Sequence, residues 1–299
     1  MIVFVPRERV DFFDTLKCVL QGTHFFSSFL QKGRYSFMII DFHVHAFPDR
    51  IAAHAIAALA QNSGYEPQSD GTFSDTCAKM DAAGIDKFVL LNVAQTPAQQ
   101  KNANSFVIEH NGGKVISFAS LHPLAEDVVY ELDRAKEAGL KGVKLHPEYQ
   151  GFDMDDKAVY PFYEACVKRD MILLFHAGFD TAYPDSRRGY PDRSSKVVKD
   201  FQGAKIVLAH LGNCLDNQET LEKLCGLDCW LDLSICYKTM STQKIKAVIN
   251  AHSAEKILYG TDFPWGNITD TISMVESLGL SDADKEKIYH KNAEELLGL

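Results

Sequence analysis

After Met38, short apolar runs alternate with longer amphipathic segments, and this alternation constrains the fold more than any other feature of the chain. The apolar runs are rich in valine, isoleucine and leucine, as expected for strands that are buried on both faces of a parallel sheet. The eight runs cover residues 38–43, 87–92, 115–121, 142–146, 171–176, 206–210, 229–234 and 257–261. They predict eight short parallel strands.

The segments between these strands have the apolar spacing of amphipathic helices. They cover residues 74–83, 98–110, 124–138, 156–169, 194–201, 217–226, 241–253, 268–278 and 282–297. Gly139 directly follows one of them and suits the left-handed conformation that commonly ends a helix. Eight alternations of strand and helix predict an α/β fold, either a (β/α)8 TIM barrel or a long doubly wound sheet. No long repeat, low-complexity run or linker divides this part of the chain, so we expect one domain.

Residue types typical of metal ligands come at the ends of these strands. They are His43, His45, His122, His146, His176, His210 and Asp262. In TIM barrels the functional groups gather at the C-terminal ends of the strands. A Gly-x-Gly-x-x-Gly run, which would favour a dinucleotide-binding sheet, is absent. The sequence therefore predicts a single-domain (β/α)8 TIM barrel over residues 38–299.

Residues 1–37 precede the first predicted strand and do not fit the alternation. Their apolar stretch from Cys18 to Leu30 is interrupted by polar residues and is a poor signal-peptide core. We expect these residues to be an N-terminal appendage, poorly ordered or not native to the protein. An extra helix packed on the barrel is the alternative.

The composition fits a soluble globular protein with a large core. Hydrophobic residues make up 46% of the chain and charged residues 24%, and the formal net charge is −9. An acidic surface disfavours nucleic acids and anionic membranes as partners, and no apolar run approaches the roughly 20 residues that span a bilayer. The seven cysteines are scattered and include no CxxC pair, which is typical of reduced thiols in a cytoplasmic protein. A homodimer is compatible with the sequence, because dimers are the commonest oligomers.

His43 and His45 lie two residues apart at the end of the first predicted strand. Residues at this spacing point to the same face of a strand, so both imidazoles can enter the mouth of the barrel and bind one ion. Neutral imidazole suits zinc and its neighbours in the first-row series. A single pair of this kind also arises by chance or on a surface, so its interpretation depends on the residue types at the ends of the other strands.

His176, His210 and Asp262 come directly after three other buried strands. Each has a structural alternative, because a histidine can be a core residue bonded to the backbone and an aspartate after a strand can cap a helix. Taken with the first histidine pair, they place several potential metal ligands at one end of the same barrel. Chance does not readily explain this coincidence.

Five motifs occur in order along residues 38–297: IIDFHVHAFP, GVKLHP, LLFHAG, IVLAHLG and ILYGTDFPW. Together they resemble the amidohydrolase superfamily, specifically the amidohydrolase-related group that includes aminocarboxymuconate-semialdehyde decarboxylase. The metal ligands that this resemblance implies are His43, His45, His176 and Asp262. The resemblance also implies that His210 is a base or proton donor beside the metal, and not necessarily a ligand.

Such a ligand set leaves a position for water on a divalent ion, for which we expect zinc, with manganese as the alternative. A bound metal lowers the pKa of water to about 7. Asp262 can then accept the water proton and later return it to the leaving group, while His210 polarises a substrate carbonyl. Lys144 raises the question of a second metal, because a carboxylated lysine on this strand bridges two ions in some members of the superfamily. We favour one metal, with Lys144 as a buried cation facing the substrate or a carboxylate such as Asp41.

Several residues are candidates for binding the substrate. They are Lys144, His146, Arg187, Arg188, Phe47 and Trp265. An arginine in the predicted loop 177–193 can hold a substrate carboxylate in bidentate fashion, although a solvated basic loop would look the same in sequence. The two aromatic residues can form apolar walls of the pocket or pack in the core. Residues 46–73 and 147–155 are expected to be further loops that shape this pocket.

The leading functional hypothesis is hydrolysis of an amide, lactone or ester bond in a small substrate, which can carry a carboxylate, by metal-bound hydroxide. The alternative is non-oxidative decarboxylation of an aromatic or muconate-like acid, in which His210 or Asp262 protonates the carbon. A basic side chain directed at the metal, whether Lys144, Arg187 or Arg188, would favour the decarboxylase. A non-catalytic metal-binding protein is a third hypothesis. A TatD-like nuclease is disfavoured, because those proteins typically carry a glutamate on the strand of Lys144.

Overall fold

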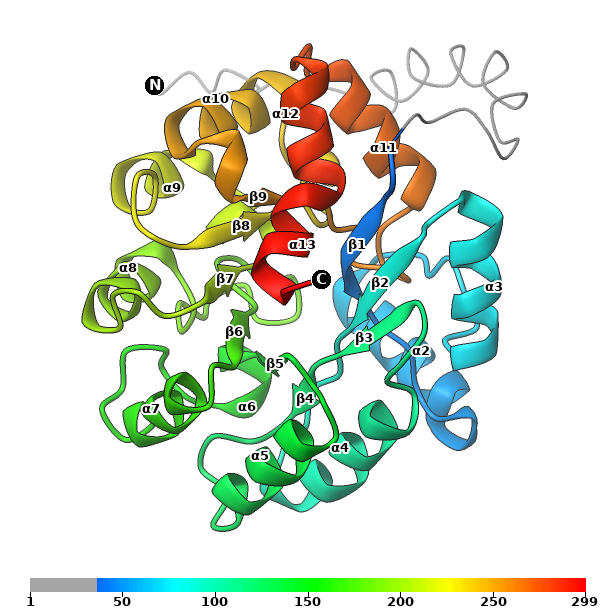
Figure 1. The fold of residues 1–299 in the computed structure, drawn as a ribbon, viewed down its shortest axis with the longest axis vertical. Helices are drawn as coiled ribbons and strands as arrows, with labels where there is room; N and C mark the ends of the chain where they lie inside the picture. Colours follow the sequence, from blue (N-terminus) through cyan, green and yellow to red (C-terminus); the bar gives the residue numbers. More distant parts are fainter. Residues whose placement is uncertain (1–36) are drawn as a thin grey trace, which may run out of the picture. The chain divides into compact units, whose positions relative to one another are not determined.

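In the computed structural model, which describes residues 37–299, short parallel strands form a ring that is surrounded by helices (Figure 1). The predicted appendage lies outside the described residues, apart from Phe37, so it stays a prediction. The strands are β1 (Ile40–Val44), β2 (Lys87–Leu90), β3 (Val115–Ser117), β4 (Ala119–Ser120), β5 (Gly142–Leu145), β6 (Ile172–Phe175), β7 (Ile206–Leu208), β8 (Trp230–Asp232) and β9 (Ile257–Leu258). Each of the eight predicted strands is present at its expected place.

The strands pair in parallel in sequence order, in one set that runs from β1 to β3 and another that runs from β4 to β9. β3 and β4 are two parts of one predicted strand, and between them the Phe118 N–H donates to the carbonyl of Leu90 at 3.1 Å. Phe42 N–H donates to the Tyr259 carbonyl at 2.8 Å, which joins β1 to the end of β9. The predicted (β/α)8 TIM barrel is confirmed.

Alternate side chains of the strands fill the inside of the barrel, as the two-residue period of a strand requires. Ile40 and Phe42 of β1 belong to one buried cluster with Leu174 of β6 and with Leu296 and Leu297 of the last helix. The other side chains of the strands pack outward against the surrounding helices in a second, larger cluster. This arrangement leaves the C-terminal ends of the strands free for a pocket.

The helices largely follow the prediction. They are α2 (Asp49–Ser63), α3 (Phe73–Ala83), α4 (Gln100–Glu109), α5 (Val128–Glu137), α6 (Pro147–Gln150), α7 (Tyr160–Lys168), α8 (Pro191–Asp200), α9 (Asn217–Lys223), α10 (Thr242–His252), α11 (Ile268–Ser277), α12 (Asp282–Glu286) and α13 (Asn292–Leu297). Between α12 and α13 lies a π-helical turn, Lys287–Lys291, so the predicted helix 282–297 is continuous but not regular. Gly139 has a φ of 82°, as expected for a residue that follows a helix.

Two segments that the sequence predicts to be loops contain helices. Residues 46–73 include the 15-residue helix α2, which buries only Ala52 and Ile56 and ends at Gly64 with a φ of 72°. Its alanine-rich sequence has a high helix propensity, but its narrow apolar face gives a weak periodic signal. Residues 147–155 begin with the single turn α6, which is too short for any periodicity to reveal. The loop prediction was wrong for both helices.

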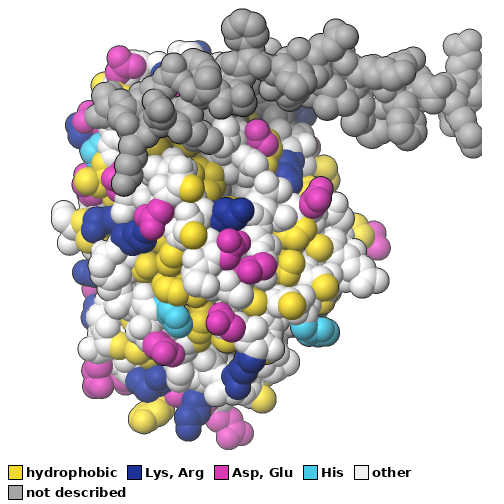
Figure 2. Space-filling model, turned by 90° about the vertical axis from the view of Figure 1, so that its right-hand side faces the viewer, with side chains coloured by type: hydrophobic (Ala, Val, Ile, Leu, Met, Phe, Trp, Pro, Cys, Tyr) yellow, Lys and Arg dark blue, Asp and Glu magenta, His cyan; other side chains and the backbone are white. Residues whose placement is uncertain are grey.

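The surface of residues 37–299 carries charges of both signs. On the visible part of the face in Figure 2, acidic and basic side chains are dispersed among hydrophobic ones. None of the helices described here combines the length and the apolar character needed to cross a bilayer. The six cysteines in this part of the chain are free thiols, and four of them are buried.

Candidate metal centre

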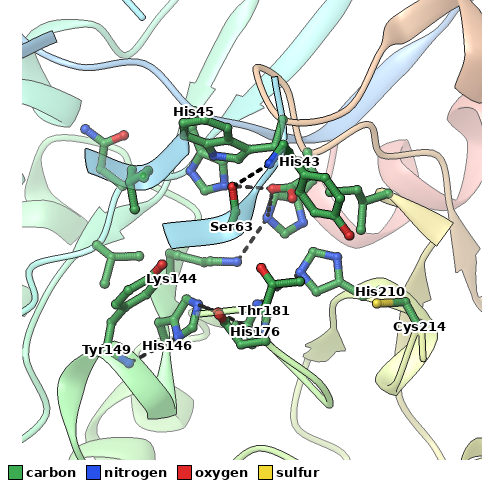
Figure 3. A pocket seen from close by; sticks show the side chains of 18 of the residues that line it. His43, His45, Ser63, Lys144, His146, Tyr149, His176, Thr181, His210 and Cys214 are labelled. Atoms are coloured by element: carbon green, nitrogen blue, oxygen red, sulfur yellow. Dashed lines mark hydrogen bonds and ion pairs between the residues drawn. The ribbon is translucent and has the colours of Figure 1, made fainter. Parts of the chain in front are cut away.

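A pocket opens at the C-terminal ends of the strands, and the predicted site residues meet there (Figure 3). The ionisable side chains that line it include His43, His45, Lys144, His146, His176, Asp180, His210 and Asp262. The aromatic side chains that line it are Phe47, Tyr65, Tyr149, Phe179 and Trp265. Nine of the predicted site residues are therefore brought together, and Arg187 and Arg188 do not line the pocket.

The hydrogen bonds of His43 leave one of its ring nitrogens available to a metal. Nδ1 donates a hydrogen bond to the carboxylate of Asp232, 2.8 Å away. Burial, followed by the neighbouring Lys144 ammonium, lowers the pKa of His43 to about 3, so the ring is neutral near pH 7. Nε2 therefore carries a lone pair, and a carboxylate that holds the other nitrogen is the usual support of a metal-binding histidine.

His45 also has one ring nitrogen held by a hydrogen bond and the other directed at the metal position, but its partner is a backbone carbonyl. Its Nδ1 donates to the carbonyl of Leu91, which can only accept, so Nε2 is the nitrogen that carries a lone pair whenever the ring is neutral. This Nε2 lies 3.1 Å from Oδ1 of Asp262. A nitrogen lone pair and a carboxylate oxygen repel each other at this distance unless a proton or a cation lies between them. The donor chemistry therefore fits a cation between His45 and Asp262.

The spacing of these atoms also fits a bound ion. Oδ1 of Asp262 lies 3.4 Å from Nε2 of His43 and 3.1 Å from Nε2 of His45. Two ligand atoms that each lie about 2.1 Å from one ion are about 3.0 to 3.4 Å apart, for ligand angles between the octahedral and the tetrahedral value. His43, His45 and Asp262 thus form one of the groups of ligand atoms that could hold a metal.

His176 takes its tautomer from His210. Nδ1 of His210 lies 3.2 Å from the carbonyl of Ser234 and therefore carries the proton, which leaves Nε2 of His210 as an acceptor. Nδ1 of His176 donates to this Nε2 at 3.0 Å. The remaining nitrogen, Nε2 of His176, is buried without a hydrogen-bond partner among the described residues. It offers a lone pair to an ion, as the predicted ligand role requires.

The structure groups His176 with a different set of residues from the other three predicted ligands. Its ring stacks on that of His146, with centroids 4.0 Å apart and planes 11° apart. Asp180 lies beside both rings, with Oδ2 3.2 Å from Nε2 of His146 and 3.7 Å from Nε2 of His176. These three residues form a second group that could hold a metal. Binding to the same ion as His43, His45 and Asp262 therefore stays a prediction for His176.

Asp262 reaches the site from a strained turn. Its φ is 62°, in the left-handed region that is uncommon for residues other than glycine. The carboxylate of Asp41 holds this turn, because it accepts hydrogen bonds from the Thr261 N–H at 3.0 Å and from the Thr261 hydroxyl at 2.6 Å. Burial raises the pKa of Asp41 to about 7, although these hydrogen bonds oppose the increase. Asp41 thus supports the residue that precedes Asp262, and no ion pair within 4.0 Å joins Asp41 to Lys144 in residues 37–299.

The carboxylates of the site are held in their ionised form. Burial by itself would raise the pKa of Asp262, but His43, His45 and His210 outweigh it and hold the pKa below its ordinary value. The same balance lowers the pKa of Asp232, through His43 and His210. An ionised carboxylate such as that of Asp262 is a common oxygen ligand of divalent ions.

Lys144 is buried in the middle of the site, on β5. Its Nζ lies 3.1 Å from Nε2 of His43, the nitrogen that faces the metal position. Figure 3 shows its amino group between His43 and His45 on one side and His146 and His176 on the other. Burial lowers the pKa of Lys144 to about 8, and Asp262 and Asp232 oppose that decrease.

The two arginines expected near the substrate are engaged elsewhere. Arg187 pairs with Glu219 at 2.8 Å, and its guanidinium lies 4.0 Å from the centroid of the Tyr190 ring. Arg188 pairs with Asp153 at 3.1 Å. Both side chains are at least 40% exposed, which fits the alternative of a solvated basic loop.

Sequence reasoning missed several residues of the pocket. Asp180 lies four residues after His176, within a segment treated as a loop of unknown shape. A carboxylate this close to a histidine at a strand end is a signal that could have found it. Tyr65 and Tyr149 belong to the segments 46–73 and 147–155, and no spacing rule could have placed them in the pocket.

The sequence profile of the amidohydrolase family matches residues 40–299, which include all the predicted metal ligands. The chain belongs to the amidohydrolase family. No curated protein matches the chain significantly. A similar barrel is found in solved structures of low sequence identity.

Three solved structures illustrate the likeness. A 2,6-dihydroxybenzoate decarboxylase in complex with 2,6-dihydroxybenzoate has a TM-score of 0.66 and 18% identity, over 88% of this chain and 100% of that one. A dihydroxybenzoic acid decarboxylase from Polaromonas, with manganese and 2-nitroresorcinol, has a TM-score of 0.64 and 19% identity, over 88% and 97%. A 5-carboxyvanillate decarboxylase from Novosphingobium aromaticivorans, with manganese and a nitrobenzoic acid, has a TM-score of 0.66 and 16% identity, over 91% and 99%. At these identities the likeness shows the fold.

Asp232 gives a first test of the candidate metal centre. Its carboxylate holds Nδ1 of His43 and also accepts the backbone N–H of His210 at 2.9 Å. We expect Asp232→Asn to weaken metal binding by about 10- to 100-fold, because His43 loses the partner that fixes its tautomer. Isothermal titration with zinc or manganese measures the change. Asp228→Asn, an exposed aspartate near the start of the same strand, serves as the matched control, and an equal loss in both variants would contradict the assignment.

Proposed function

We propose that this member of the amidohydrolase family is a metal-dependent carboxy-lyase that removes the carboxyl group of a small aromatic acid without oxidation. The observation that carries this proposal is the buried ammonium of Lys144, 3.1 Å from the metal-facing nitrogen of His43. A basic side chain directed at the metal is the feature expected to distinguish a decarboxylase from a hydrolase. The decarboxylases among the similar structures support the same choice.

The proposed cofactor is one divalent metal ion. The residues that would hold it are His43, His45, His176 and Asp262. Three imidazoles favour zinc, and manganese is the alternative, which two of the similar structures contain. The ion would supply positive charge that orients the oxygens of the acid and withdraws electrons from the bond that breaks.

The side chains of the pocket would carry out the rest of the reaction. Aromatic side chains such as Phe47, Tyr149 and Trp265 line the pocket and would contact a planar ring. The bond between the ring and the carboxylate breaks, carbon dioxide leaves, and a proton takes its place on the ring carbon. We assign delivery of this proton to His210, which lines the pocket: its Nε2 would first take up a proton from solvent and then transfer it to the ring carbon, while its Nδ1 stays held by Ser234. Asp262 stays ionised as a metal ligand.

Hydrolysis of an amide, lactone or ester is the second candidate. It is favoured by the ionised carboxylate of Asp262, which lies beside the ligand histidines and could accept a proton from an attacking water. Lys144 has no comparable role in hydrolysis. We therefore place hydrolysis second.

An assay of both reactions tests the proposal. The purified protein is depleted of metal, reloaded with zinc or manganese, and incubated with a panel of hydroxybenzoates that includes 2,6-dihydroxybenzoate and 5-carboxyvanillate. We expect carbon dioxide to be released by the reloaded protein and not by the depleted one. A parallel panel of lactones, amides and esters serves as the comparison. Metal-dependent hydrolysis in that panel, with no carbon dioxide from any acid, would reverse the order of the two candidates.

A further inference from the structure

Lys144 makes a single hydrogen bond in the described part of the chain. Its side chain is almost completely buried, and among residues 37–299 the only hydrogen-bond partner of Nζ is Nε2 of His43. Lys144 forms no ion pair there within 4.0 Å. A buried ammonium group normally requires several acceptors, because it has three protons and loses its hydration. The hydrogen bonding of Lys144 is therefore incomplete.

The one partner of Lys144 is also the nitrogen that a metal would use. Nδ1 of His43 is bound to Asp232, so Nε2 has the only lone pair of the ring. A lone pair that coordinates a metal cannot also accept a hydrogen bond from an ammonium. Metal binding at His43 would thus remove the only partner of Lys144 and place a second cation close to it.

The charges around the pocket indicate that an anion would replace His43 as the partner of Lys144. Among the side chains that line the pocket, Asp180 and Asp262 are acidic and Lys144 is basic, and the ionised Asp232 lies directly behind His43. A divalent ion adds two positive charges to this set. Metal binding therefore makes the pocket more favourable for an anion than it is without the metal.

We propose that metal binding transfers Lys144 from His43 to an anionic oxygen of the ligand, so that the metal and Lys144 together form a carboxylate subsite that the metal-free protein lacks. This inference rests on the proposed metal centre. A carboxylate suits the subsite because it has two oxygens that can accept from the ammonium and contact the metal at the same time. A neutral amide of the same shape offers one oxygen and no negative charge.

Binding measurements on the unmodified protein test this coupling without any turnover. Metal affinity is measured by isothermal titration in the presence of saturating benzoate, in the presence of benzamide, and without either compound. We expect benzoate to raise metal affinity about tenfold or more, and metal to raise benzoate affinity by the same factor, because coupling is reciprocal. Benzamide should have little effect. Equal benzoate affinity with and without metal would overturn the inference.

The variant Lys144→Met separates this role from a structural one. Without the competing ammonium, the variant should bind the metal more tightly than the unmodified protein when no anion is present, and it should lose most of the coupling to benzoate. A merely structural role predicts weaker metal binding instead. Lys238→Met is the matched control, since Lys238 lies over the ring of Tyr65 but does not line the pocket. The control should keep the coupling unchanged.

The outcomes also distinguish this inference from the proposed function. If carbon dioxide is released but benzoate and metal bind independently, the function stands and the inference fails. If the two bind cooperatively but no acid is decarboxylated, the inference stands and the proposed reaction fails. A carboxylated Lys144, detected by carbon-13 NMR after metal loading in bicarbonate, would also overturn the inference, because the ammonium would no longer exist.

Discussion

Asp262→Asn should weaken metal binding by more than about 100-fold, a larger loss than removal of a group that only supports a ligand. The carboxylate oxygen lies 3.4 and 3.1 Å from the nitrogens of His43 and His45 that face the metal. An asparagine keeps the shape of the side chain but removes the negative charge that balances the ion. Competition with a chromophoric chelator measures the affinity.

Asp180→Asn is the matched control for this experiment. Asp180 lies in the same pocket but beside His146 and His176, in the second group of potential ligands. We expect it to leave the affinity for the first ion largely unchanged. If Asp180→Asn causes the larger loss, the ion binds at the second group and the assignment of Asp262 is wrong.

His210→Asn should lower kcat by about 10²- to 10⁴-fold while the protein keeps its metal. An asparagine can occupy the space of the imidazole but cannot carry a proton to the substrate. Steady-state kinetics on the substrate found in the decarboxylation panel, combined with metal analysis of the same sample, checks both parts. Loss of the metal together with activity would make His210 a ligand, and unchanged activity would favour the non-catalytic hypothesis.

The barrel could be predicted from the sequence because its strands are buried on both faces. Such strands appear as short, almost continuous apolar runs, and the eight runs match the observed strands even where β3 and β4 are separated by Phe118. The helix α2 could not be predicted in the same way, since it buries only Ala52 and Ile56 and has no strong apolar period. Periodicity reveals a helix only to the extent that one face of it is buried.

The site residues that could be predicted from the sequence are those at the ends of strands. His43, His45, Lys144 and Asp262 extend from strand ends, so their residue types and parity indicated a common pocket, and the structure brings them within hydrogen-bonding distance. The arginines were not predictable, because their directions depend on ion pairs such as that of Arg188 with Asp153. A basic loop looks the same in sequence whether its charges face a substrate or their own neighbours.

The central claim is that one divalent ion binds at the histidine pair that ends the first strand. Metal analysis combined with a crystal structure that locates the ion by its anomalous scattering tests this claim most directly. The account predicts one ion per chain, coordinated by Nε2 of His43 and of His45 and by Asp262, with His176 as the fourth ligand. An ion held instead by His146, His176 and Asp180, or two ions bridged through Lys144, would contradict it.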